Sequence, residues 1–548
     1  MKRCLINILS IGIITAVSGC GTGSDTGGQS GEPETVTISL DELRDKIAGG
    51  WAGKMIGVAY GAPTEFRWQG KIIDGELDWA PDWAANSFKQ DDLYVQLSFM
   101  ETMDDFGIDA PAEKFAESFA TAGYRLWHAN VQARKNFFDG IMPPLSGSPE
   151  YNLHADDIDF QIEADYIGFM SPGMPATACR IADKIGHIMN YGDGVYGGMF
   201  VAALYCEAFF EDDIPTIVDR ALHSIPAESD YSKCIRDVAA LHQHYPGDWE
   251  KAWQELERKW GDVDICGAMQ PFNIDAKLNG AYIAMGLLYG EGDFGRTVEI
   301  STRCGQDSDC NPSNAAAVIG VINGFSGIPD SWKSGIEPVA DSLFIYTRYS
   351  FKSAVDNTVS YAVKLTEMNC GSLDGDMLTI KRQTPQAPPL EVSFSNTVPS
   401  YMADVFESEG WTFTGNWHEF KARTYYSKGE VPYAKEADTA GASATFTFSG
   451  TGVVIKGDWV RDGGRADVYL DGEPDRTIDT YYWWGGEDKR FSFLWHKLGL
   501  DDGEHTVRIV LNGDKNPDSN GTRVRISGAT VFTTGSKKNE TYKLSFEQ

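Results

Sequence analysis

Two carboxylates separated by one residue stand directly before a predicted helix near the middle of the chain. Asp307 and Asp309 lie in the run 303–320, where Asn311 and Pro312 are typical of a helix N-cap and first helical position. Helix capping would need only one aspartate, whereas hard cations such as Mg²⁺ and Ca²⁺ prefer several oxygen ligands. The spacing therefore predicts a divalent cation site on the turn before this helix.

An EF-hand loop also begins with acidic residues at alternate positions, but this segment departs from that pattern. Counted from Asp307, position six is Pro312 instead of glycine, and position twelve is Val318 instead of glutamate. The loop therefore cannot surround a Ca²⁺ ion by itself, and further ligands must come from elsewhere in the chain.

Two further motifs lie upstream. A second acidic pair, Asp91 and Asp92, follows Gln90 and opens another predicted helix. Before it, the glycine-rich run 49–57 leads to Ala-Pro-Thr-Glu, which ends at Glu65. In this order the three motifs resemble the ADP-ribosylglycohydrolase family, over about residues 40–338. The resemblance implies an all-α catalytic domain that cleaves glycosidic bonds.

The resemblance also implies a metal-dependent active site, usually with magnesium. We expect one or two divalent cations, most simply Mg²⁺, with Mn²⁺ or Ca²⁺ as alternatives. The implied metal ligands are Asp91, Asp92, Asp307 and Asp309. The implied catalytic residues are Glu65, as proton acceptor or as a gate over the site, with Asp92 and Asp307.

Two positions depart from the family pattern. Gln90 stands where the family has a threonine or serine, and Cys310 stands where it has a threonine. Gln90 can still offer a carbonyl oxygen, whereas the Cys310 thiol is a soft ligand in a hard site. We keep both as candidate ligands, with Asn311 as a possible substitute, and leave open whether one cation binds or two.

Polar residues between the motifs are candidates for binding the substrate. On a helix, Asp157, Gln161 and Asp165 would share one face, which would be either a solvated acidic face or the lining of a pocket. The apolar residues around them favour the pocket. The predicted substrate-binding residues are His128, Asn130, His154, Asp157, Asp159, Gln161, Asn190, Asp193 and Asn311.

The first 38 residues predict export. Lys2 and Arg3 precede the apolar run 5–17, which is too short to cross a membrane. The run ends in Val-Ser-Gly-Cys, which resembles a bacterial lipoprotein cleavage box, so we expect a signal peptide over 1–20 and a lipid on Cys20. An ordinary secretory signal is the alternative. Residues 21–38 then form a flexible tether.

The 548 residues predict more than one domain, and the sequence changes character after a Pro-rich segment. We expect a multidomain α + β chain: an all-α catalytic domain over 39–375, a linker over 376–394 and a β-sandwich over 395–548. The β-sandwich resembles galactose-binding-like modules. Its aromatic group, consisting of Tyr481, Tyr482, Trp483 and Trp484, either stacks on sugar rings or packs between domains.

A net charge of −32 argues against nucleic acid as a partner and leaves the lipid as the only contact with a membrane. We therefore expect an exported, metal-dependent hydrolase that cleaves an N- or O-glycosidic bond to a ribofuranosyl group such as ADP-ribose. The first alternative is an extracellular glycan as substrate with the same chemistry. The second is a surface glycan-binding lipoprotein that has lost catalysis.

Overall fold

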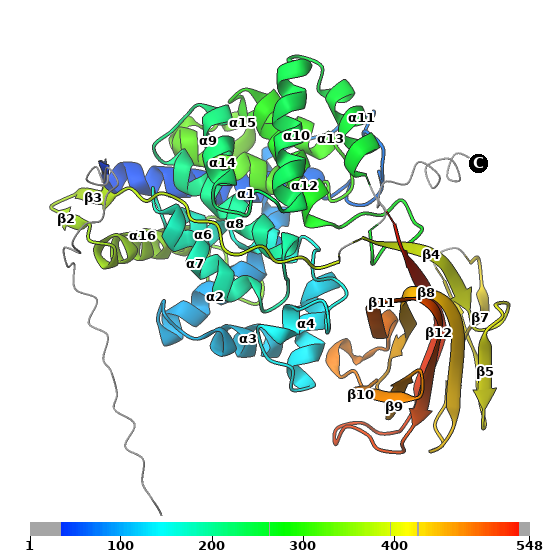
Figure 1. The fold of residues 1–548 in the computed structure, drawn as a ribbon. Coiled ribbons are helices and arrows are strands. Elements are labelled where there is room, and N and C mark those ends of the chain that lie inside the picture. The colour runs from blue at the N-terminus through cyan, green and yellow to red at the C-terminus, as the bar shows by residue number, and fades with distance from the viewer. Residues whose placement is uncertain (1–33, 262–263, 395, 425–426, 536–548) are drawn as a thin grey trace, which may run out of the picture.

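The computed structural model describes residues 34–261, 264–394, 396–424 and 427–535. They form a helical domain followed by an antiparallel β domain, which lie side by side (Figure 1) and confirm the predicted fold class. The predicted signal peptide and Cys20 lie outside the described residues. Within the described ranges, no helix combines the length and the apolar character needed to cross a bilayer.

The helical domain is built around a close pair of helices, α1 (Leu40–Gly61) and α14 (Cys310–Gly327). Glycines at every fourth position of α1 face α14 and let the two backbones touch. A Cβ atom at Gly53 would lie 2.4 Å from the carbonyl oxygen of Ala316, and one at Gly57 would lie 2.3 Å from that of Pro312. This contact fixes the end of α1 beside the start of α14. The glycines are Gly49, Gly53, Gly57 and Gly61.

Replacing Gly57 by alanine should therefore destabilise the protein by about 2–3 kcal/mol, because the new methyl group meets backbone atoms that cannot rotate away. Urea unfolding measures the change in the free energy of unfolding. Gly247→Ala is the matched control, since a Cβ atom there meets nothing within 4 Å. Equal unfolding midpoints for the two variants would show that α1 and α14 can separate without cost.

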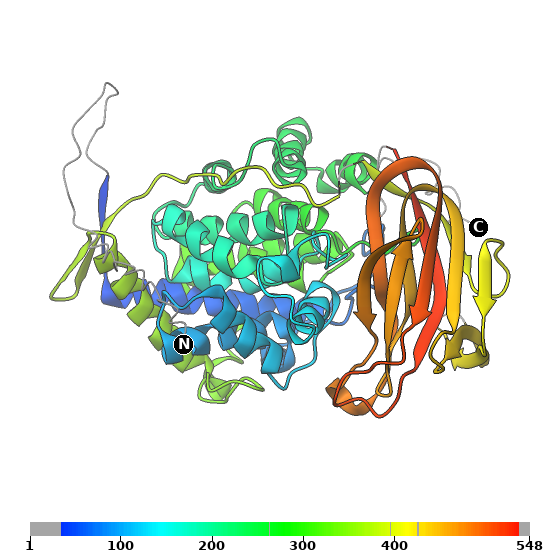
Figure 2. The same cartoon turned by 60° about the horizontal axis from the view of Figure 1, so that its bottom comes forward.

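Further helices cover this pair on all sides (Figures 1 and 2). The α-helices are α2 (Asp91–Phe106), α3 (Ala112–Thr121), α4 (His128–Phe138), α5 (Asp159–Glu163), α6 (Asp165–Phe169), α7 (Pro175–Gly186), α8 (Asp193–Ala208), α9 (Ile214–Leu222), α10 (Asp230–His244), α11 (Trp249–Trp260), α12 (Ala276–Gly290), α13 (Phe294–Arg303), α15 (Asp330–Lys333) and α16 (Phe351–Met368). Short 3₁₀ helices are η1 (Pro81–Lys89), η2 (Leu145–Gly147) and η3 (Glu337–Val339).

A small antiparallel sheet joins the two ends of the helical domain. Its strand order is β1 (Thr35–Ser39), β3 (Met377–Lys381) and β2 (Ser372–Asp374). Strand β1 begins inside the predicted tether and β3 lies within the predicted linker, so both segments contain ordered strand. After β3 the chain runs across the helical domain (Figures 1 and 2). There Arg382 pairs with Glu207 at 2.6 Å, and Glu391 pairs with His187 at 3.1 Å.

In the β domain, the described strands form one connected antiparallel sheet that curls on itself. The first part of β8 (Ser443–Trp459) pairs with β5 (Trp411–Thr414), and its last part pairs with β12 (Val524–Thr534). Long strands that change partner half way let a sheet fold over a core, as sandwiches do. The other strands are β4 (Thr397–Asp404), β6 (His418–Arg423), β7 (Glu430–Ala437), β9 (Arg465–Leu470), β10 (Glu473–Asp479) and β11 (Lys489–Leu511).

A small apolar cluster, separate from the main core, joins the two domains. Leu153 and Ile265 of the helical domain pack with Phe394 of the connection and with Val454 and Phe532 of the β domain. All five side chains are buried. The β domain is therefore seated on the helical domain through a continuous core.

The aromatic group of residues 481–484 also lies at this boundary. The Trp483 ring packs on Phe138 of α4 with ring centroids 4.2 Å apart, and Arg134 lies 6.0 Å from the Trp484 ring. Tyr481 and Tyr482 are buried. The structure thus favours packing between domains, the second of the two alternatives, for this group.

Candidate active site

Acidic residues from three separate motifs meet in what we call the acidic centre. One ligand atom each of Glu65, Asp307 and Asp309 lies within 4.8 Å of the others, and the same holds for Asp92, Asp309 and Cys310. Asp309 belongs to both groups and joins them. The structure therefore brings Asp92 of the upstream pair together with Asp309, and Asp309 together with Asp307 and Glu65.

Two turns position these side chains. Asp307 and Asp309 lie on the turn before α14, and Glu65 lies on the turn after α1. The N–H of Phe66 donates to the carbonyl of Gln306 at 2.9 Å, which ties one turn to the other. Because the glycines of α1 lie against the backbone of α14, these two turns have little freedom to move apart.

A buried lysine that sequence reasoning missed supports the acidic centre. The Lys54 ammonium lies 3.5 Å from Asp92 and 2.9 Å from Asp165, and it donates to the carbonyl of Ile162 at 2.8 Å. Burial disfavours its charge, but Asp165 and Asp92 outweigh burial and raise the pKa of Lys54. The sequence signal for this lysine was its position in the later part of α1, residues 47–61, where every other residue is apolar or glycine.

Burial and mutual repulsion govern the charges of the acidic centre. Burial raises the pKa of Asp92, Asp307 and Asp309, and neighbouring carboxylates raise those of Asp307 and Asp309 further. Desolvation, together with Asp309 and the aspartate pair at 91 and 92, raises the pKa of Glu65 to about 8. Desolvation and Asp92 raise the pKa of Asp91 to about 7. These carboxyls lack enough positive charge to ionise together.

The donor set fits a divalent cation. Among the described residues, the buried atoms Asp307 Oδ1 and Asn311 Oδ1 have no hydrogen-bond partner. The Asn311 amide donates to Asn279 Oδ1 at 3.0 Å, which leaves its own oxygen free. Unpaired buried oxygens cost free energy unless a cation or donor meets them. Carboxylate and amide oxygens are the ligands that Mg²⁺ and Ca²⁺ prefer.

Three other candidate ligands have weaker support. The Cys310 thiol lies 3.3 Å from Asp92 Oδ2, inside the acidic centre, although sulfur is a soft ligand. Gln90 is the N-cap residue of α2 and makes no side-chain capping hydrogen bond. Asp91 belongs to neither group of three ligand atoms. Their role as ligands stays a prediction.

The raised pKa values of Glu65 and Asp91 predict how the cation-free protein responds to pH. Their carboxyls keep protons when folded, but titrate near pH ~4 when unfolded. The stability they provide is therefore complete below about pH 4 and is lost as the pH rises through about 7–8. We expect the melting temperature in EDTA to fall between about pH 5 and pH 8, and Mg²⁺ to restore it. A melting temperature in EDTA that stays level over this range would contradict the prediction.

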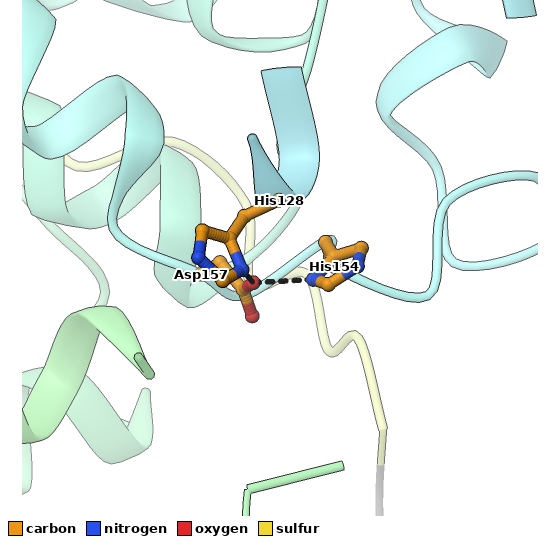
Figure 3. A group of neighbouring side chains, drawn as sticks. All are labelled: His128, His154 and Asp157. Carbon is orange, nitrogen blue, oxygen red and sulfur yellow. Dashed lines mark hydrogen bonds and ion pairs between the residues drawn. The ribbon is translucent and has the colours of Figure 1, made fainter. Parts of the chain in front are cut away.

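The predicted substrate-binding residues divide into two sets. His128, His154 and Asp157 lie together, as Figure 3 shows, and the two histidines are partly exposed. Most of the others hold the backbone or each other. The Asn130 amide donates to Glu163 at 2.6 Å, and Gln161 accepts from the Tyr231 hydroxyl at 2.8 Å. Asp159 accepts from the backbone N–H groups of residues 129 and 130. The Asn190 amide donates to carbonyls of the 154–157 loop.

One expectation about this region needs correction. Asp157, Gln161 and Asp165 do not share a helical face, because Asp157 lies in a loop and a break at Ala164 separates α5 from α6. Asp193 lines a hollow of about 650 Å³ together with residues 390–394 and 396. Its role in substrate binding stays a prediction.

An aromatic wall extends from the acidic centre toward the β domain. Phe66, directly after Glu65, packs on Phe272 with ring centroids 4.9 Å apart, and Phe272 stacks on His128 at 5.7 Å. Phe493 of β11 lies 5.3 Å from the His154 ring. Both domains therefore contribute to the surface beside the carboxylates.

Comparison with known proteins gives a family and several partial likenesses. A family model described as ADP-ribosylglycohydrolase matches residues 39–361. A solved structure, an ADP-ribosylglycohydrolase-related protein complex, aligns with 59% of this chain and 98% of its own, at 16% identity and a TM-score of 0.42.

Two curated proteins of Flavonifractor plautii match a shorter part. One is an A type blood alpha-D-galactosamine galactosaminidase, 38% identical over 101 residues, which are 18% of this chain and 9% of that protein. The other is an A type blood N-acetyl-alpha-D-galactosamine deacetylase, 35% identical over 98 residues, which are 18% of this chain and 12% of that protein. The chain thus spans a small fraction of either protein.

Proposed function

This chain belongs to the ADP-ribosylglycohydrolase family, and we propose that it is a glycosidic-bond hydrolase whose acidic centre works with a bound divalent cation. The observation that carries the proposal is the convergence of Glu65, Asp92, Asp307 and Asp309, with buried oxygens that lack partners. When bound there, the cation would polarise the glycosidic oxygen and attract sugar hydroxyls.

The residues of the chain then have distinct tasks. Glu65 is the one exposed carboxylate of the acidic centre. A bound cation would favour its charged form over the protonated form of the cation-free protein, so Glu65 could then take a proton from the attacking water. Lys54 holds Asp92 in place through its own charge. Asp309, in contact with both halves of the centre, would hold the cation together with Asp307 and Asp92.

For the substrate we propose a glycan outside the cell. The likeness to two proteins named for A-type blood glycans supports this choice, as does the aromatic wall beside the carboxylates, because aromatic faces stack on sugar rings. The predicted signal at residues 1–20 supports export with a lipid on Cys20. The family resemblance supports an ADP-ribosyl adduct as the second candidate substrate.

Product analysis tests both the chemistry and the substrate. The full chain, loaded with Mg²⁺, is incubated with A-type blood-group glycans, other glycans and an ADP-ribosylated protein. We expect release of a sugar from a glycan, loss of release after chelation and recovery with added Mg²⁺. Full turnover after exhaustive chelation would rule out the cation. A folded, Mg²⁺-loaded protein that releases nothing from any substrate would favour the non-catalytic alternative.

A further inference from the structure

Two histidines and an aspartate converge near the boundary of the domains, in a group of ligand atoms that shares no residue with the acidic centre. His154 Nδ1 lies 2.6 Å from Asp157 Oδ2, and His128 Nδ1 lies 3.8 Å from the same oxygen. All three ligand atoms lie within 4.8 Å of one another (Figure 3). One histidine begins α4, and the other two residues come from the loop before α5.

The backbone is held in the shape that this convergence needs. His128 has a φ of 42°, in the left-handed region that few residues other than glycine adopt. Asn190 fixes the loop by donating to the carbonyls of His154, Ala155 and Asp157 at 3.3, 3.1 and 2.9 Å. Strain together with dedicated clamps is common where a site must be held ready.

The buried carboxylate of Asp157 faces two imidazole rings. The Asp157 side chain is 1% exposed, and both of its ion-pair contacts are to the histidines. Imidazole nitrogens offer lone pairs to a metal ion. Buried carboxylates in proteins are paired or coordinate metals.

A neighbouring combination is less suited to a cation. Asp264 and Cys266 also approach Asp157. However, Asp264 already accepts from the N–H groups of Cys266, Gly267 and Ile274, and the Cys266 thiol donates to the carbonyl of Leu153 at 3.1 Å. In the part of the chain that the structure describes, the ring nitrogens of His128 and His154 make no hydrogen bond to a backbone group.

We propose that His128, His154 and Asp157 form a second metal site, which binds a divalent first-row transition ion such as Zn²⁺. Two imidazoles and a carboxylate with an open position are a donor set that such ions prefer, unlike the all-oxygen preference of Mg²⁺. Ligands at the usual distances around a tetrahedral ion lie about 3.4 Å apart. The observed 2.6 and 3.8 Å bracket this separation, so small side-chain rotations suffice.

Solvent reaches the two histidines of this site. The His128 side chain is 28% exposed and that of His154 is 14% exposed, so an ion can enter from solvent. The proposal does not depend on the proposed function, because it requires binding only.

Titration of the full chain with Co²⁺ in saturating Mg²⁺ tests the proposal. Saturating Mg²⁺ competes for the oxygen ligands of the acidic centre, while Co²⁺ in a tetrahedral site with imidazole ligands gives intense visible d–d bands. We expect one equivalent to bind with such bands and Zn²⁺ to displace it. The double variant His128→Asn with His154→Gln should weaken Co²⁺ binding at least about 100-fold. Asparagine tolerates the left-handed backbone at position 128, which protects the fold.

Two controls make the outcome decisive. His505→Gln removes the histidine of a surface pair, His505 and Asp471 at 2.7 Å, that lacks a second imidazole, and should leave the bands unchanged. Asp309→Asn, which alters the acidic centre, should also leave them unchanged. If the double variant fails to fold, Asp157→Asn provides the same readout. Bands that persist in the folded site variants, or no bands in the unmodified chain, would overturn the proposal.

Discussion

Replacing Asp309 by asparagine should lower kcat/KM by at least about 10²- to 10³-fold and abolish Mg²⁺ binding at the acidic centre. Asp309 joins both groups of ligand atoms, so its loss removes a charge from each. Its carboxylate also accepts from the N–H of Cys310 at 3.0 Å as the N-cap of α14. Asparagine caps helices equally well, so the effect should come from the lost charge and not from a damaged helix.

Calorimetry with Mg²⁺, alongside turnover of the substrate identified by product analysis, measures both losses. Asp330→Asn is the matched control, because Asp330 begins α15 with a side chain that is 91% exposed. It should leave affinity and kcat/KM unchanged. A folded Asp309 variant with the affinity and turnover of the unmodified chain would show that the cation, if it binds, does so elsewhere.

Part of the acidic centre could be predicted because its signals are local. Carboxylates at the spacing of Asp307 and Asp309 indicate a cation whatever the distant fold. The predicted N-cap was wrong, because α14 begins at Cys310 with Asp309 as its N-cap, and Asn311 and Pro312 lie inside the helix. That Asp92 joins them followed from the family resemblance alone. The two aspartate motifs meet because the glycines of α1 allow close contact with α14, and this contact is visible only in the folded structure.

Features that depend on contacts between residues far apart in the sequence could not be predicted. The charge of Lys54 makes sense only beside Asp165, which lies far along the chain and reaches it through tertiary packing. Strand β1 pairs with β3 across most of the helical domain, so neither strand could be read from its own residues. Helical spacing also misled at Asp157, because the loop there is held by Asn190 and not by helix hydrogen bonds.

The β domain makes direct contacts with the loop of the helical domain that carries His154 and Asp157. His496 donates to the carbonyl of Pro149 at 2.7 Å, and Arg476 donates to that of Glu150 at 3.0 Å. Directly after them, Leu153 packs into the apolar cluster with Val454 and Phe532. The loop that carries His154 and Asp157 therefore rests on the β domain.

A truncated chain that ends at Ser393 should consequently lose about 10²-fold or more in kcat/KM, even on a small soluble substrate. Without Val454 and Phe532 the loop loses its packing, and misplacement by about 1 Å can cost 10²-fold. The exposed apolar surface should also cause association, visible by light scattering.

Phe493→Ala in the full chain isolates the ring contact with His154 and should raise KM while the protein stays monomeric. Phe413→Ala is its control, because Phe413 lies in β5 on the far side of the β domain (Figure 1) and should change neither quantity. A truncated chain that is folded, monodisperse and fully active on a small substrate would show that the β domain only tethers the substrate.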